Sequence, residues 1–139
     1  MKYVIQIGLA LMALALLNSC KSNSSVAIED QGVYFKNLKD GQTVSSPVKV
    51  KMGIKGMEIE PAGKINKGKG HHHIIINGSS LLSGKVVPAD KNNLHFGKGQ
   101  TEAELELKPG NYTLTLQFAD GAHRSYGAKW SKTIKIKVK

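Results

Sequence analysis

The stretch GHHHIIIN at residues 70–77 carries the strongest structural signal in the chain. Its three isoleucines are β-branched and favour an extended backbone, so the stretch predicts a strand with histidines at its entrance. Side chains alternate along a strand, so we expect His71 and His73 on one face, and His72 on the other face with Ile74. Two histidines at this spacing lie within roughly 7 Å of each other, which suits a pair of metal ligands.

The segments around this strand show the same two-residue period of apolar and polar side chains, and no helical period stands out after residue 20. About seven short strands separated by turn residues predict an all-β protein, an antiparallel immunoglobulin-like β-sandwich. Tyr112 follows a Pro-Gly turn at the start of a late strand, a position suited to a tyrosine corner. Besides the histidine strand, the expected strands are 33–35, 48–55, 81–87, 103–107, 112–118 and 130–138.

The N-terminus has the pattern of an export signal rather than of a domain. Lys2 precedes an apolar run at residues 5–17, which is too short for a good membrane span. The run ends in Leu-Asn-Ser-Cys20, which resembles the bacterial lipoprotein signal; an ordinary secretory signal with an incidental cysteine is the alternative. The predicted organisation is a signal peptide at 1–19, a lipidated Cys20 with a flexible tether to residue 32, and a β-sandwich domain at 33–139. This predicts a bacterial cell-envelope protein that is anchored to membrane lipid through Cys20 and is periplasmic or surface-exposed.

Composition narrows the function classes further. The chain has 20 Lys and Arg against 10 Asp and Glu, and one cysteine. Acylation of Cys20 would leave no internal disulfide and would exclude a blue-copper site, which needs a cysteine thiolate. The positive charge fits either a solubilising surface or attraction to anionic lipid or polysaccharide. Nucleic acid is not expected as a partner, because the lysines are not interleaved with aromatic residues and the chain is exported.

Several short motifs are spread over the predicted domain. They are Gly56-Met57 with Pro61-Ala62-Gly63, Gly70-His71-His72-His73, His95-Phe96-Gly97-Lys98-Gly99-Gln100-Thr101-Glu102, Pro109-Gly110 before Tyr112, and Asp120-Gly121-Ala122-His123. Together they resemble a bacterial envelope family, Domain of Unknown Function 4399. The resemblance extends from about residue 33 to the C-terminus, and it implies no established activity.

All five histidines lie in these motifs, and loops distant in sequence can meet at one end of a sandwich. Histidine is the commonest protein ligand for copper and zinc, and a soft thioether would favour copper. The candidate metal ligands are therefore His71, His73, His95 and His123, with Met57 as a fifth. The competing interpretation is structural: loop histidines can bond carbonyl groups, and Met57 can fill a gap in the core. His72 is the member of the triplet expected to be buried.

These observations predict a lipid-anchored envelope domain that binds a transition-metal ion, copper before zinc, for storage, delivery or tolerance. We do not expect an enzyme: a dismutase-like activity is a minor alternative, and no Gly-x-Ser-x-Gly nucleophile motif is present. The second hypothesis is an interaction module without metal, which binds an anionic polymer or an envelope partner protein through its basic faces.

Overall fold

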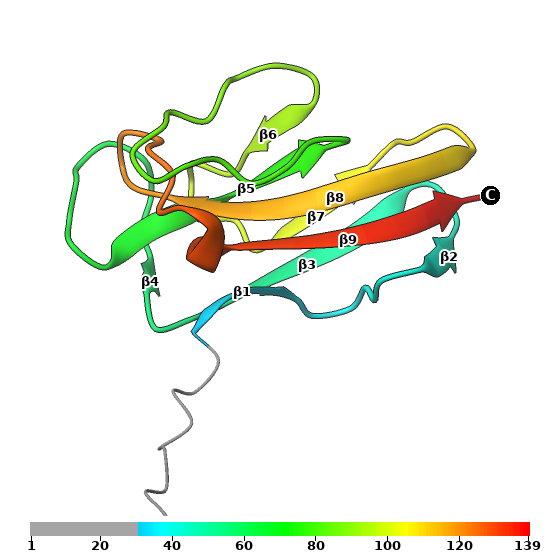
Figure 1. The fold of residues 1–139 in the computed structure, drawn as a ribbon, viewed down its shortest axis with the longest axis horizontal. Helices are drawn as coiled ribbons and strands as arrows, with labels where there is room; N and C mark the ends of the chain where they lie inside the picture. The colour runs from blue at the N-terminus through cyan, green and yellow to red at the C-terminus, as the bar shows by residue number, and fades with distance from the viewer. Residues whose placement is uncertain (1–30) are drawn as a thin grey trace, which may run out of the picture.

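The computed structural model describes residues 31–139, which form two packed β-sheets (Figure 1). Their strands are β1 (Gly32–Phe35), β2 (Gln42–Val44), β3 (Val48–Lys55), β4 (Glu58–Ile59), β5 (Lys69–Ile76), β6 (Asn93–His95), β7 (Glu102–Leu105), β8 (Gly110–Ala119) and β9 (Ser131–Val138). A short 3-10 turn, η1 (Ala128–Trp130), leads into β9. The smaller sheet has the order β1-β3-β7, and the larger has the order β2-β9-β8-β5-β4 with β6 paired to β5.

Strand β3 shows why the sequence forms a sandwich. Val48, Val50 and Met52 are almost fully buried, whereas Lys49 and Lys51 are exposed. This alternation lets one face of the small sheet pack on the large sheet while the other face remains in water. On this exposed face, Lys49 and Lys51 form ion pairs with two glutamates of the antiparallel neighbour β7. Because these pairs are in solvent, they add a modest stabilisation at most.

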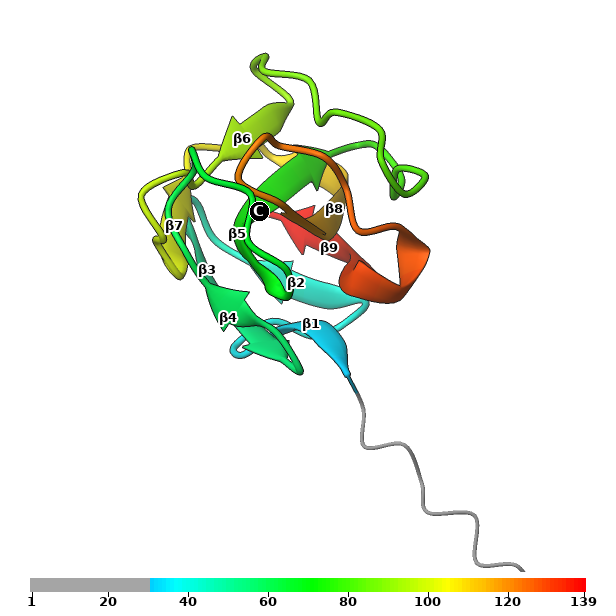
Figure 2. The same cartoon turned by 90° about the vertical axis from the view of Figure 1, so that its left-hand side faces the viewer.

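The core lies between the sheets and contains large apolar side chains from both. The central strand β8 contributes Leu114, Leu116 and Phe118, each 0% exposed, and β5 contributes Ile74. Strand β8 pairs with β5 on one side and with β9 on the other, in both cases antiparallel. Figure 2 shows the two layers from the end of the molecule, with β1 and β3 below β5, β8 and β9.

The strand order confirms the sandwich prediction. Immunoglobulin sandwiches place strands A, B and E in one sheet and C, F and G in the other. Here β1-β3-β7 and β5-β8-β9 reproduce these two orders. The hydroxyl of Tyr112 donates to the carbonyl of Lys108 at 3.0 Å near the start of β8, as expected of a tyrosine corner.

Some details differ from the sequence prediction. Nine strands are present in the described residues rather than about seven, and two short pairs, β2–β9 and β4–β5, are parallel. Strands of two or three residues are too short to show a hydrophobic period, so they left no signal. Residues 81–87 were expected to form a strand, but only Val86 makes an isolated bridge, to Arg124. Glycine at position 84, with φ of 81°, breaks the extended backbone there.

The outer face of β8 is a further difference. The two-residue period of the predicted strand 112–118 would leave Thr115 and Gln117 facing solvent, yet both are 0% exposed. The connecting segments cover this face: the Gln117 amide accepts from the amide nitrogen of Leu81 and donates to the carbonyls of Gly127 and Trp130. The large sheet is therefore buried on both faces along its middle.

The predicted signal peptide, the predicted lipidation site at Cys20 and most of the predicted tether lie outside the described residues. Strand β1 begins at Gly32, beside the predicted domain start at residue 33. Within residues 31–139, no helix has both the length and the apolar character needed to cross a membrane.

Candidate metal centre

Strand β5 places the histidine triplet on the two faces of the large sheet. His71 and His73 lie on the outer face, opposite Ala119 and Gln117 of β8, and both are buried at 0% and 1% exposure. The triplet occupies the third to fifth residues of β5 rather than its entrance. The strand continues back to Lys69 because the β4–β5 pairing extends it before the histidines.

His72 points the other way, into the core. Its ring lies 5.1 Å from the ring of Phe118, edge to face, and its exposure is 0%. Neither ring nitrogen of His72 has a hydrogen-bond partner within the described residues. Burial, followed by the charges of His71 and Lys36, lowers the pKa of His72 to about 4, so this ring is neutral at pH 7. The alternation predicted from the sequence is confirmed.

His95 comes from β6, the short strand that pairs with β5. Its backbone is opposite His73 in the register, and its ring stacks on the ring of His73 with 5.0 Å between centroids. The ring also lies close over Gly97: a Cβ atom at that position would be 2.2 Å from Nε2 of His95. The absence of a side chain at Gly97 therefore makes room for the His95 imidazole.

His123 comes from the turn that follows β8. Its backbone has a φ of 62°, which is uncommon for a residue other than glycine. Its amide nitrogen donates to the carbonyl of Asp120 at 2.9 Å, and its carbonyl accepts from Val87 at 2.9 Å. These bonds hold His123 over the end of β8, beside the buried pair of histidines.

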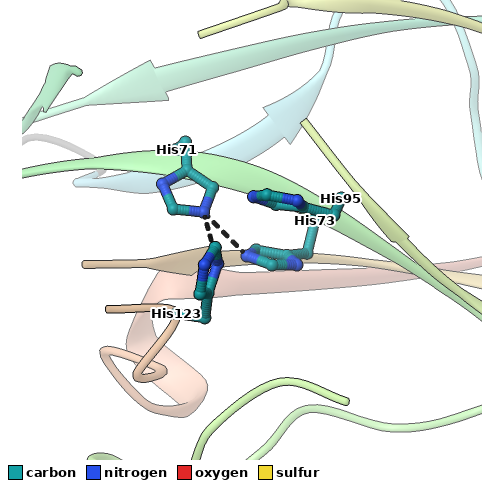
Figure 3. A group of neighbouring side chains, drawn as sticks. All are labelled: His71, His73, His95 and His123. Carbon is teal, nitrogen blue, oxygen red and sulfur yellow. Dashed lines mark hydrogen bonds between the residues drawn. The ribbon is translucent and has the colours of Figure 1, made fainter. Parts of the chain in front are cut away.

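The four histidines converge at one point (Figure 3). Nε2 of His71 is 3.1 Å from Nδ1 of His123 and 3.1 Å from Nε2 of His73. One ligand nitrogen from each of the four rings lies within 4.8 Å of the other three. Four nitrogens around a tetrahedral ion with bonds of 2.0–2.1 Å would be about 3.3 Å apart. The two 3.1 Å distances are already close to this value, whereas any distance near the 4.8 Å limit would have to shorten for all four nitrogens to bind one ion.

The environment keeps the two buried histidines of the cluster uncharged. Burial first, and then repulsion between the rings, lower the pKa of His71 to about 4 and that of His73 to about 3. The pKa of His95 is also lowered, by burial and by His123. A neutral imidazole presents a lone pair, which is the form that binds metal. His95 is exposed and His123 is partly exposed, so solvent reaches the cluster from their side.

The structure therefore brings together His71, His73, His95 and His123, all four of which the sequence singled out. Met57, the fifth candidate, is partly buried and packs against the hydrophobic core. Its role as a ligand stays a prediction. Sequence reasoning assigned no role to Asp120 or Gly97, although both lie in motifs noted there. An aspartate that begins a turn just before a histidine was the available signal for the first.

Comparison with known proteins gives a class but no activity. The family model described as "Domain of unknown function (DUF4399)" matches residues 50–139, so the chain belongs to that family. Among curated proteins the comparison finds no match. Among solved structures, the chain is similar to the endo-beta-1,4-mannanase from Thermotoga petrophila, with 15% identity and a TM-score of 0.48. That similarity covers 84% of this chain and 21% of the mannanase chain, so this protein spans about a fifth of it.

Proposed function

We propose that this protein binds one transition-metal ion, copper before zinc, through His71, His73, His95 and His123. The observation that carries the proposal is the convergence of four ring nitrogens within 4.8 Å of one another. Imidazole ligands suit copper, zinc, iron and nickel, whereas carboxylates suit magnesium and calcium, and the four-residue group contains no carboxylate. Cu(II) binds nitrogen sites more tightly than Zn(II), which supports copper first.

The burial of the cluster supports binding and exchange rather than catalysis. His71 and His73 form the buried side of the cluster, whereas His95 and His123 form its solvent side, where an ion would enter and leave. Four protein ligands fill a tetrahedral shell, and catalytic metal sites usually keep one position open for water or substrate. A role in storage, delivery or tolerance follows, at the cell envelope if Cys20 is lipidated as its sequence context predicts.

Metal titration of the purified protein tests the proposal. We expect binding of one Cu(II), Cu(I) or Zn(II) ion per chain at pH 7.5, weakened by at least about 100-fold in His73→Ala, which removes a buried ligand. Free metal at 100 times its Kd should raise the free energy of unfolding by about 2.7 kcal/mol. Since burial keeps His71 and His73 neutral, protons should displace the ion only below about pH 6, where an ordinary histidine becomes protonated.

His72→Leu is the matched control, because it alters the same triplet and keeps the core filled but leaves the cluster intact. Equal loss of binding in both variants would contradict the assignment of ligands. Absence of metal uptake together with salt-sensitive retention on an anionic polymer would favour the interaction-module hypothesis instead.

A further inference from the structure

Asp120 closes the turn that carries His123. One carboxylate oxygen, Oδ1, accepts from the amide nitrogens of Ala122 and Arg124 at 2.9 and 3.0 Å. The other, Oδ2, accepts from Nε and Nη2 of Arg124, both at 2.8 Å. Its backbone also accepts from His123 and donates to the carbonyl of Arg124. Each residue from Ala122 to Arg124 therefore forms at least one hydrogen bond with Asp120.

This carboxylate is buried, and its hydrogen bonds and its ion pair with Arg124 stabilise its negative charge. Its side chain is 7% exposed, and burying an isolated carboxylate is costly unless it is paired and hydrogen-bonded. Burial raises the pKa of the Asp120 carboxyl, but hydrogen bonds from Arg124 and Ala122 and the Arg124 charge outweigh it, so the net pKa lies below its ordinary value. The group is thus ionised at pH 7 and has fixed partners.

The turn has no regular secondary structure to hold His123 in place. His123 has a left-handed backbone conformation, and a residue other than glycine keeps such a conformation only where its surroundings impose it. Outside the bonds to Asp120, its backbone has one further bond, from Val87. The position of Nδ1 of His123, 3.1 Å from Nε2 of His71, depends on this small set of contacts.

We propose that Asp120 is a positioning residue of the metal centre: its carboxylate fixes the turn that aims the His123 imidazole at His71. The proposal rests on the proposed metal-binding function. Groups that orient metal ligands without touching the metal commonly change metal affinity by 10- to 100-fold when they are mutated. Asp120 would act on the ion through His123 rather than bind it directly.

The test compares Cu(II) and Zn(II) affinities of the protein and its Asp120 variants by chelator competition. We expect Asp120→Ala to weaken binding about 10- to 100-fold. Asp120→Asn keeps an oxygen for the two amide donors but loses the Arg124 ion pair, so its loss should be smaller. Asp40→Ala is the matched control: the Asp40 carboxylate also accepts from a backbone amide, that of Lys135 at 2.7 Å, but lies outside the histidine group and the segments that carry it. The metal affinity of this control variant should equal that of the unsubstituted protein.

A double-mutant cycle with His123→Ala separates positioning from general destabilisation. If Asp120 acts through His123, then Asp120→Ala should change affinity less than about threefold once His123 is absent. An equal loss with and without His123 would overturn the proposal, as would wild-type affinity in Asp120→Ala.

A metal-free measurement tests the positioning role by itself. The ring centroids of His71 and His123 are 5.1 Å apart, so nuclear Overhauser contacts between their ring protons should be present in the protein and lost in Asp120→Ala. Retention of these contacts in the variant overturns the positioning role even if metal binds. A wild-type protein that takes up no metal overturns the proposed function, whatever the ring contacts show.

Discussion

His72 lies between two cluster histidines in the sequence, yet its ring packs on Phe118 inside the sandwich. The strand period alone separates it from His71 and His73, because adjacent side chains of a strand leave on opposite faces. At the scale of single residues, individual contacts decide where a side chain lies. The clearest example is the contact between the His95 ring and the backbone of Gly97.

Gly97→Ala should weaken metal binding about tenfold or more. The added Cβ would be 2.2 Å from Cε1 and Nε2 of His95, so the ring must turn away from the cluster. Because the His95 side chain is exposed and can move aside, the cost to folding stability should be small. Gly53→Ala is the matched control, since its Cβ would be 2.3 Å from the Tyr34 ring on the small sheet. Calorimetric titration should show lost affinity in the first variant only; equal affinities would contradict the role of Gly97.

At the scale of elements, β8 is the strand that holds both β5 and the turn bearing His123. It pairs with β5 beneath the histidine pair, and the turn bearing His123 begins where it ends. The Gln117 side chain lies on its outer face, opposite His73 in the register, and binds the Leu81 amide and the carbonyls around η1. The segments that cover this face are thus attached to the strand itself.

Gln117→Leu should lower the free energy of unfolding by about 1–3 kcal/mol, because the part-buried Leu81 amide and the buried carbonyl of Trp130 lose their partner. Chemical denaturation measures the change. Gln100→Leu provides the comparison: Gln100 is exposed and bonds only the nearby Lys98 amide, so its effect should stay within about 0.5 kcal/mol. Similar losses in the two variants would mean that the Gln117 contacts contribute nothing special.

At the scale of the whole molecule, the burial of three adjacent histidines makes folding sensitive to acid. Burial, followed by neighbouring charges, lowers the pKa values of His71 and His72 to about 4 and that of His73 to about 3. The unfolded chain binds protons at these sites from about pH 6.5 downward, whereas the folded protein does not until much lower pH. Stability is therefore complete above pH 6.5 and is lost as the pH falls toward 4.

The unfolding free energy of the metal-free protein should thus fall between pH 6.5 and 4, by at most about 1.4 kcal/mol per pH unit for each of these histidines. His72→Leu removes one of these histidines, so its slope should be smaller. Urea unfolding at several pH values measures both slopes. Measurements at pH 8, where the histidines are neutral in both states, isolate the packing change. Parallel slopes from pH 6.5 to 4 would contradict the prediction.

The sequence by itself determined the sandwich, the faces of the histidine triplet and the four members of the cluster. These follow from local rules. The two-residue period of a strand fixes which face each side chain occupies, and clustered histidines in short motifs are unusual enough to be noticed in the sequence. Residues 81–87 escaped these rules, because a segment that packs on a sheet can be as apolar as a strand.

Only the tertiary structure decided where the four imidazoles meet. The sequence suggested that loops converge at one end of the sandwich, but the centre lies on the outer face of the large sheet, where β6 and the turn after β8 flank β5. The same holds for Asp120 and Gly97, whose importance comes from what they touch. Contacts between segments 22 to 52 residues apart, such as His73 with His95 and His71 with His123, depend on strand order and register, which no local pattern encodes.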